Sequence, residues 1–179
     1  MFPPQSPISY EQMLEEIPQW IAHNFPEASP LQQFLGMQEE LGEAATCLTT
    51  LKLNRGEFLL LGMMETIGNL CHSRLKRMQG IRGEHDEHIA FEMVYITRLS
   101  KLAAEYGEML EKKDFSLTPT ENQSFTRSDL LEDSIGDLSI FMHSMCSMLG
   151  QNPMEITLKV WEEVRTRDWK KFPKNGKDE

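Results

Sequence analysis

Apolar residues recur at helical spacing along nearly the whole chain, and this pattern restricts the fold more than any other feature. An example is Ile156, Val160 and Val164, which follow the helix-start residues Asn152 and Pro153 and are predicted to form a buried stripe. A chain of 179 residues can bury one substantial core. We therefore predict a single all-α domain, a helical bundle of about six helices.

Proline, glycine and capping residues mark where these helices begin and end. Helices are expected at about 9–24, 30–54 and 57–79, followed by a fourth that ends near 112, a fifth that ends at 150 and a sixth from 153. Around the domain at 9–169, we predict a flexible N-terminal extension at 1–8, a loop at about 114–128 and a basic, mobile tail at 170–179.

Composition narrows the classes of partner and location. A net charge of −10 disfavours nucleic-acid binding, which needs a dominant basic surface. The longest apolar run, 58–64, is too short to span a membrane, and the N-terminus does not resemble a signal peptide. The odd set of Cys47, Cys71 and Cys146 lacks metal-ligand spacing, so thiols in a reducing compartment are expected. We predict a cytoplasmic protein with neither a nucleic-acid nor a membrane partner.

Two groups of acids interrupt the apolar stripes. Glu40 and Glu43 are three residues apart on one helix, and Asp133 and Asp137 are four apart on another, so each pair shares a helix face. Ionised carboxylates are unfavourable away from water unless a positive charge meets them. An all-oxygen ligand set suits Mg²⁺, with Mn²⁺ as the alternative. We therefore expect these four acids to point inward. The other interpretation is that both pairs lie on solvated faces.

The sequence also contains an internal echo. Residues 35–42 recur at 61–68 with a constant offset of 26, and Glu132 and Asp137 match Glu87 and Glu92 at an offset of 45. Either amphipathic helices are similar by chance, or a helical hairpin is duplicated and forms a four-helix core as a pseudo-dimer. In the second copy, covering 61–96, Thr66 replaces Glu40, Asn69 replaces Glu43 and His88 replaces Asp133, leaving Glu65 and Glu92 as carboxylates.

Four segments carry a more specific resemblance. Residues 30–43, which include Glu39-Glu40-Leu41-Gly42-Glu43, and then 75–83, 133–138 and 161–169 resemble, in order, the MazG-like branch of the all-α nucleoside triphosphate pyrophosphohydrolases. The resemblance covers about 20–169. It implies cleavage of a nucleoside triphosphate between its α and β phosphates, giving the monophosphate and pyrophosphate, with Mg²⁺ held by acids of two helices. It also implies a homo-oligomer, expected to be a dimer.

The resemblance also implies roles for individual residues. The expected metal ligands are Glu40, Glu43, Asp133 and Asp137, and water activation is expected from Glu39 or Glu40. The usual family pattern has a glutamate three residues before the final aspartate, where this chain has Ser134. Asp133 can reach the same face from one residue earlier and is expected to replace it.

Basic and aromatic residues are the candidates for substrate binding. Those expected at the phosphates are Lys76, Arg82, Arg167, Lys170 and Lys171. Phe34, with Trp20 and Gln33 nearby in sequence, is expected near the base. Alternatively, the cations of the tail complement a helix C-terminus. Trp20, Gln33 and Phe34 would then belong to the core.

Two further functions fit the same helices. A catalytically inactive regulator or adaptor could keep this fold without turnover. A carboxylate-bridged di-iron bundle would require Glu-x-x-His motifs, which the acidic helices lack. His85 and His88 could suggest a different metal, but they are better explained as part of a polar first turn.

Overall fold

The computed structural model describes residues 9–49, 53–80, 85–116 and 128–166. These contain six helices, which confirms the predicted all-α bundle. The helices are α1 (Tyr10–Asn24), α2 (Pro30–Leu48), α3 (Arg55–Gln79), α4 (His85–Lys112), α5 (Ser128–Met148) and α6 (Pro153–Val164). The predictions for 1–8 and 170–179, and most of the predicted loop, lie outside the described residues.

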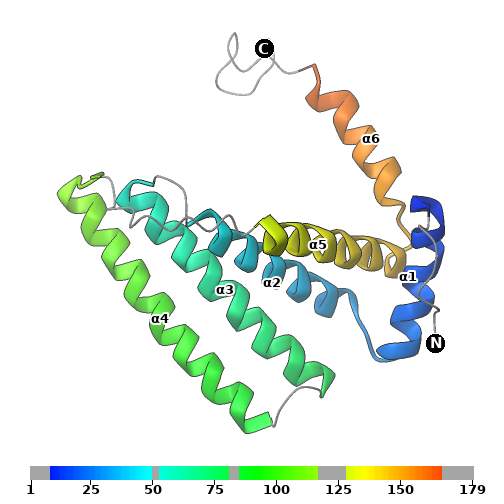
Figure 1. Cartoon of the computed structure of the whole chain (residues 1–179), viewed down its shortest axis with the longest axis horizontal. Helices are drawn as coiled ribbons and strands as arrows, with labels where there is room; N and C mark the ends of the chain where they lie inside the picture. Colours follow the sequence, from blue (N-terminus) through cyan, green and yellow to red (C-terminus); the bar gives the residue numbers. More distant parts are fainter. Residues whose placement is uncertain (1–8, 50–52, 81–84, 117–127, 167–179) are drawn as a thin grey trace.

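Four long helices lie side by side in the order α4, α3, α2 and α5 (Figure 1). α2 packs between α3 and α5, whereas α4 packs on the outer side of α3. α1 contacts α5, and α6 extends away from the bundle with α5 as its only helix contact among the described residues. The acidic helices α2 and α5 are therefore direct neighbours.

Local capping explains most helix starts. Ser9, Ser29 and Asn54 each accept a hydrogen bond from the backbone N–H three residues ahead, and a glutamine or glutamate there bonds back. The Asn152 side chain accepts bonds from two backbone N–H groups at the start of α6. α3 ends at Gln79 and is capped by Gly80, whose φ of 65° is favourable for glycine.

Two glycines allow α2 and α3 to approach closely. A Cβ atom added at Gly42 would lie 2.7 Å from the Cα of Gly68, and one added at Gly68 would lie 2.7 Å from the Cα of Gly42. These glycines are equivalent in the 26-residue echo, so the helices meet at matching positions. The duplication itself stays a prediction. On the α5 side, Gly36 gives the Phe141 ring room against α2.

Two helix ends and one buried stripe differ from the predictions. α2 ends at Leu48 rather than near 54, because Asn54 caps α3 instead of continuing α2. α5 ends at Met148, two residues early. The stripe predicted to be buried on α6 is exposed. Ile156 and Val160 are 41% and 53% exposed, because α5 is the only helix that contacts α6 within the described part of the chain. No described helix has the length and apolar character needed to cross a membrane.

Candidate functional site

The acids of α2 occupy three adjacent directions around the helix. Glu39 and Glu40 are 8% and 7% exposed, whereas Glu43 is exposed to solvent. At 100° per residue, Glu43 lies between the other two on the open face of α2. Glu39 bonds to α3, and Glu40 lies near the acids of α5. The three carboxylates therefore extend across α2 from α3 towards α5.

Glu40 has the most perturbed carboxyl group. Burial, followed by the charges of Glu43, Glu39, Asp137 and Asp133, raises its pKa from 4.5 to about 8. All four neighbours act in the same direction, and no cation offsets them among these contributions. Near neutral pH, ionised Glu40 is thus unfavourable without an added positive charge.

The pKa values of the exposed acids Glu43 and Asp137 are raised as well, by partial desolvation and by neighbouring carboxylates. Partial desolvation and the charge of Glu39 raise the pKa of Glu43, while His72 acts in the opposite direction. The pKa of Asp137 is also raised, by partial desolvation, by Asp133 and by Glu39, with Lys76 opposing. Asp133 contributes to the raised pKa values of Glu40, Glu43 and Asp137 although its own side chain is exposed. We refer to Glu39, Glu40, Glu43, Asp133 and Asp137 as the acid cluster.

Glu39 has a specific partner across the α2–α3 contact. Its Oε1 atom pairs with Nδ1 of His72, whereas its Oε2 atom is buried and has no hydrogen-bond partner among the described residues. Gly42 and Gly68 bring the two helices close beside this pair. His72 therefore fixes the orientation of the Glu39 carboxylate, whose second oxygen stays buried and unpaired among the described residues.

The acids of the cluster are close enough to shift one another's pKa values, but their side chains are not arranged around a single point. Within the described residues, no three histidine, cysteine, aspartate or glutamate side chains lie close enough together to hold a metal ion. The side chain of Ser134, where the family pattern has a glutamate, is buried, and its hydroxyl has no partner there. The predicted ligands Glu40, Glu43, Asp133 and Asp137 are brought together as neighbours without converging on one point.

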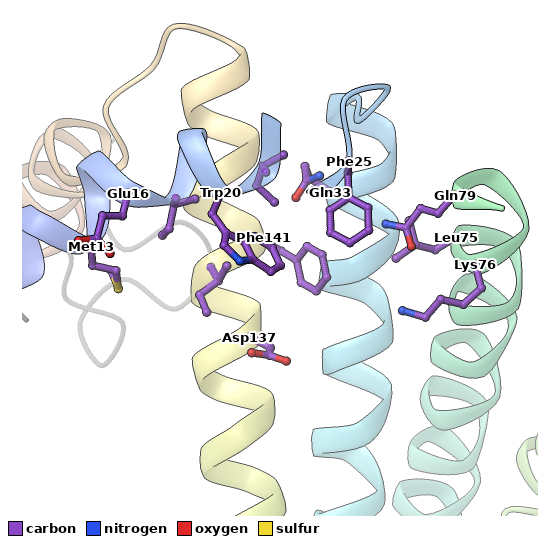
Figure 2. A pocket seen from close by; sticks show the side chains of 13 residues that line it. Met13, Glu16, Trp20, Phe25, Gln33, Leu75, Lys76, Gln79, Asp137 and Phe141 are labelled. Carbon is purple, nitrogen blue, oxygen red and sulfur yellow. The ribbon is translucent and has the colours of Figure 1, made fainter. Parts of the chain in front are cut away.

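A cavity of about 520 Å³ borders the acid cluster. Helices α1, α2, α3 and α5 all contribute to it, and Asp137 is part of its lining (Figure 2). Aromatic side chains of Trp20, Phe25 and Phe141 form much of the wall, and Lys76 reaches in from α3. A smaller groove of about 310 Å³ lies on the other side of the cluster, lined by Glu39, Glu43, Glu65, Asn69, His72 and Tyr95 among others.

The predicted substrate-binding residues have different outcomes. Lys76 lies at the cavity, whereas Phe34 is 48% exposed and does not line it. Trp20 and Gln33, which were interpreted either as core or as base-binding residues, both line the cavity. The remaining candidates lie outside the described residues: Arg82, Arg167, Lys170 and Lys171.

Within its described residues, the second copy of the echo contains no acid cluster. Glu65 pairs with Arg98 at 2.7 Å, and Glu92 pairs with Arg77 at 2.8 Å, so each carboxylate has its own guanidinium partner. Thr66, at the position equivalent to Glu40, is fully buried and bonds to the backbone of its own helix. This half of the bundle is therefore already neutralised.

Sequence reasoning missed His72 and Gln79, which reach the site from α3. A signal for His72 exists, since Glu65, Asn69, His72 and Lys76 are spaced at 4, 3 and 4 residues and form a polar stripe on one face of α3. Gln79 is three residues beyond Lys76 on nearly the same face.

No protein-family model, curated protein or solved structure matches this chain.

Proposed function

We propose that the protein is a Mg²⁺-dependent nucleoside triphosphate pyrophosphohydrolase that cleaves between the α and β phosphates. One observation carries this proposal: Glu40 is buried beside four other carboxylates, and its burial together with their charges raises its pKa to about 8. Such a cluster is unfavourable unless it binds positive charge. Mg²⁺ would supply that charge, and the same ion binds the phosphate oxygens of a triphosphate substrate. The resemblance to the MazG-like enzymes agrees with this chemistry.

The acid cluster fits a hard divalent cation. Its donors are all carboxylate oxygens, which suit Mg²⁺ and also Mn²⁺. Glu40, Glu43 and Asp137 would hold the ion, with Asp133 as the fourth ligand. The exposed members can change rotamer to reach it, whereas buried Glu40 is fixed. When bound, the ion would neutralise phosphate charge and polarise an attacking water.

The protein's own residues have distinct parts in the reaction. Glu39, held by His72 and with one oxygen unpaired, accepts a proton from water as the water oxygen bonds to the α phosphorus. The bond from that phosphorus to the bridging oxygen breaks, and pyrophosphate leaves. Lys76, beside Asp137 at the edge of the cavity, contacts the phosphates. Because nucleoside triphosphates are cytoplasmic metabolites, we propose that the protein acts in the cytoplasm.

Turnover with common and modified triphosphates, Mg²⁺ and ¹⁸O-labelled water tests the proposal. We expect pyrophosphate release, with the label in the monophosphate because water attacks the α phosphorus. Glu43→Gln should abolish turnover, while Glu108→Gln, an exposed change on α4, should not. If no triphosphate is cleaved, or if Glu43→Gln is as active as the natural protein, the proposal is wrong and an inactive regulator becomes the better interpretation.

We also propose that two copies pair through the face opposite the acids. Leu41 and Ile67 each lie one residue before a glycine of the α2–α3 contact, Gly42 or Gly68. Glu43 and Asn69 each lie one residue after these glycines and line the groove of about 310 Å³. Residues two apart point in nearly opposite directions on a helix, so Leu41 and Ile67 share the other face.

Further exposed apolar side chains extend this face. Phe34 and Leu48 lie seven residues to either side of Leu41, and Leu60 lies seven before Ile67. We call these five side chains the apolar face. For a chain of net charge −10, an uncharged stripe is where a second copy can dock without bringing like charges together.

A further inference from the structure

We propose that the cavity between α1, α2, α3 and α5 binds the base of the nucleotide, and that the amides of Gln33 and Gln79 select bases carrying an amino group. This inference rests on the proposed function, because it takes the bound group to be part of a nucleoside triphosphate.

The cavity has the size and walls that suit a planar ring. Its volume of about 520 Å³ lies within the range of small-molecule sites, roughly 300–1,000 Å³. Trp20 and Phe25 come from α1 and its C-terminal cap, and Phe141 comes from α5 (Figure 2). Aromatic side chains on several sides favour stacking with a flat heterocycle over binding of a flexible aliphatic chain.

Two polar groups in this apolar space lack partners. Gln33 is only 2% exposed, and its Oε1 atom is buried without a hydrogen-bond donor among the described residues. The Oε1 atom of Gln79, from α3, is in the same state. Buried acceptors are nearly always paired in folded proteins, because leaving them unpaired is unfavourable. Both residues line the cavity, so a ligand that brings two N–H donors to these side chains would satisfy both oxygens.

Nucleobases differ in how many such donors they offer. The amino group of adenine or cytosine carries two N–H bonds, and guanine has an amino group as well as a ring N–H. Uracil and thymine offer only one ring N–H at that edge and would leave one amide oxygen unpaired. A site built to hydrogen-bond a donor discriminates strongly against a ligand that lacks it.

The position of the cavity agrees with this assignment. Lys76 from α3 and Asp137 from α5 point inward at the side where the cavity meets the acid cluster (Figure 2). A base held between the aromatic side chains would place the attached triphosphate towards Lys76 and the five acids. One continuous site then serves both ends of the nucleotide.

Binding of uncharged nucleosides to the full chain, in buffer with a metal chelator, tests the inference apart from hydrolysis. By calorimetry or saturation-transfer NMR, we expect adenosine and cytidine to bind at least about tenfold more tightly than uridine and thymidine. Gln33→Leu and Gln79→Leu should each remove that preference. Gln19→Leu, the same change on the exposed side of α1, should keep it.

The outcomes separate this inference from the proposed activity. Equal binding of cytidine and uridine, no nucleoside binding, or an unchanged preference in both cavity variants would overturn it, even if triphosphates are hydrolysed. A clear amino-base preference in a protein without pyrophosphohydrolase activity would support the cavity assignment and refute the proposed reaction. Because Gln79 is only half-buried, Gln79→Leu remains informative if Gln33→Leu fails to fold.

Discussion

Replacing Glu40 by glutamine is expected to stabilise the metal-free protein at neutral and alkaline pH. In the natural protein, ionised Glu40 is buried against Glu43, Glu39, Asp137 and Asp133, and its pKa rises from 4.5 to about 8. Glutamine has nearly the same shape and no charge, and its amide can donate to the neighbouring carboxylates. The substitution therefore removes the repulsion and keeps the packing.

The size of the effect follows from proton linkage. Below pH 4.5, Glu40 is protonated in both the folded and the unfolded chain, so it does not destabilise the fold. As the pH rises from 4.5 towards 8, the unfolded chain releases the proton and the folded chain retains it, so stability is lost over this interval. The limit at pH 8 is about 4 kcal/mol. Water around the exposed acids screens part of the field, so we expect a gain of about 2 kcal/mol for Glu40→Gln.

Urea unfolding in a metal chelator at pH 5 and pH 8 measures this difference. The stability of Glu40→Gln relative to the natural protein should increase from pH 5 to pH 8, while Glu108→Gln on the surface should change by less than about 0.5 kcal/mol. Added Mg²⁺ should stabilise the natural protein at pH 8 and have a much smaller effect on Glu40→Gln. A variant that is equally or less stable than the natural protein at pH 8 would refute the reasoning, since Glu40 would then not be under repulsion.

Three further predictions concern the helix contacts. Gly42→Ala should lose about 2 kcal/mol of unfolding free energy, because its Cβ would meet Gly68. Gly107→Ala has open space around it and should gain up to about 1 kcal/mol. Urea unfolding measures both changes. Burial lowers the pKa of His143, whose Nε2 atom is 2.6 Å from the Tyr10 hydroxyl. The unfolded chain therefore binds a proton more readily than the folded chain, and stability should fall as the pH drops below 6.5. Melting curves should show a smaller loss for His143→Gln. Leu41→Glu with Ile67→Glu should convert a dimer to a monomer in sedimentation experiments, whereas Leu149→Glu should not; a natural protein that sediments as a monomer contradicts the proposed pairing.

The helices could be predicted because their signals are local. Ser29 with Pro30, and Asn152 with Pro153, mark helix starts through bonds that span only three residues. Burial of the α6 stripe could not be predicted in the same way. An amphipathic pattern indicates that a face is suited to burial, but the partner that covers it is not part of the pattern.

The candidate site was predicted in part for the same reason. Glu40 could be placed inward because apolar residues flank it on its own helix, and it is buried. Asp137 carries a similar pattern on α5, yet it is exposed, because α5 has α2 on one side and an open cavity at its edge. His72 and Gln79 approach from α3, which is distant from the site residues of α2 in sequence, so the packing of α3 on α2 determines which side chains meet.

That contact also explains why a single acid cluster suits this bundle. Gly42 and Gly68 lie at equivalent positions of the echo and meet where α2 crosses α3. If the second copy also carried acids at its positions equivalent to Glu40 and Glu43, both sets of acids would flank this one crossing. Burial and the four neighbouring acids already raise the pKa of Glu40 to about 8, and a second set of acids would add its repulsion to the first. In the other half, Thr66 is neutral and the remaining carboxylates pair with arginines. Helices α3 and α4 therefore support α2 without adding to the repulsion among its acids. Within the described residues, the acid cluster on α2 and α5 leaves Glu40 without a neutralising cation beside the cavity.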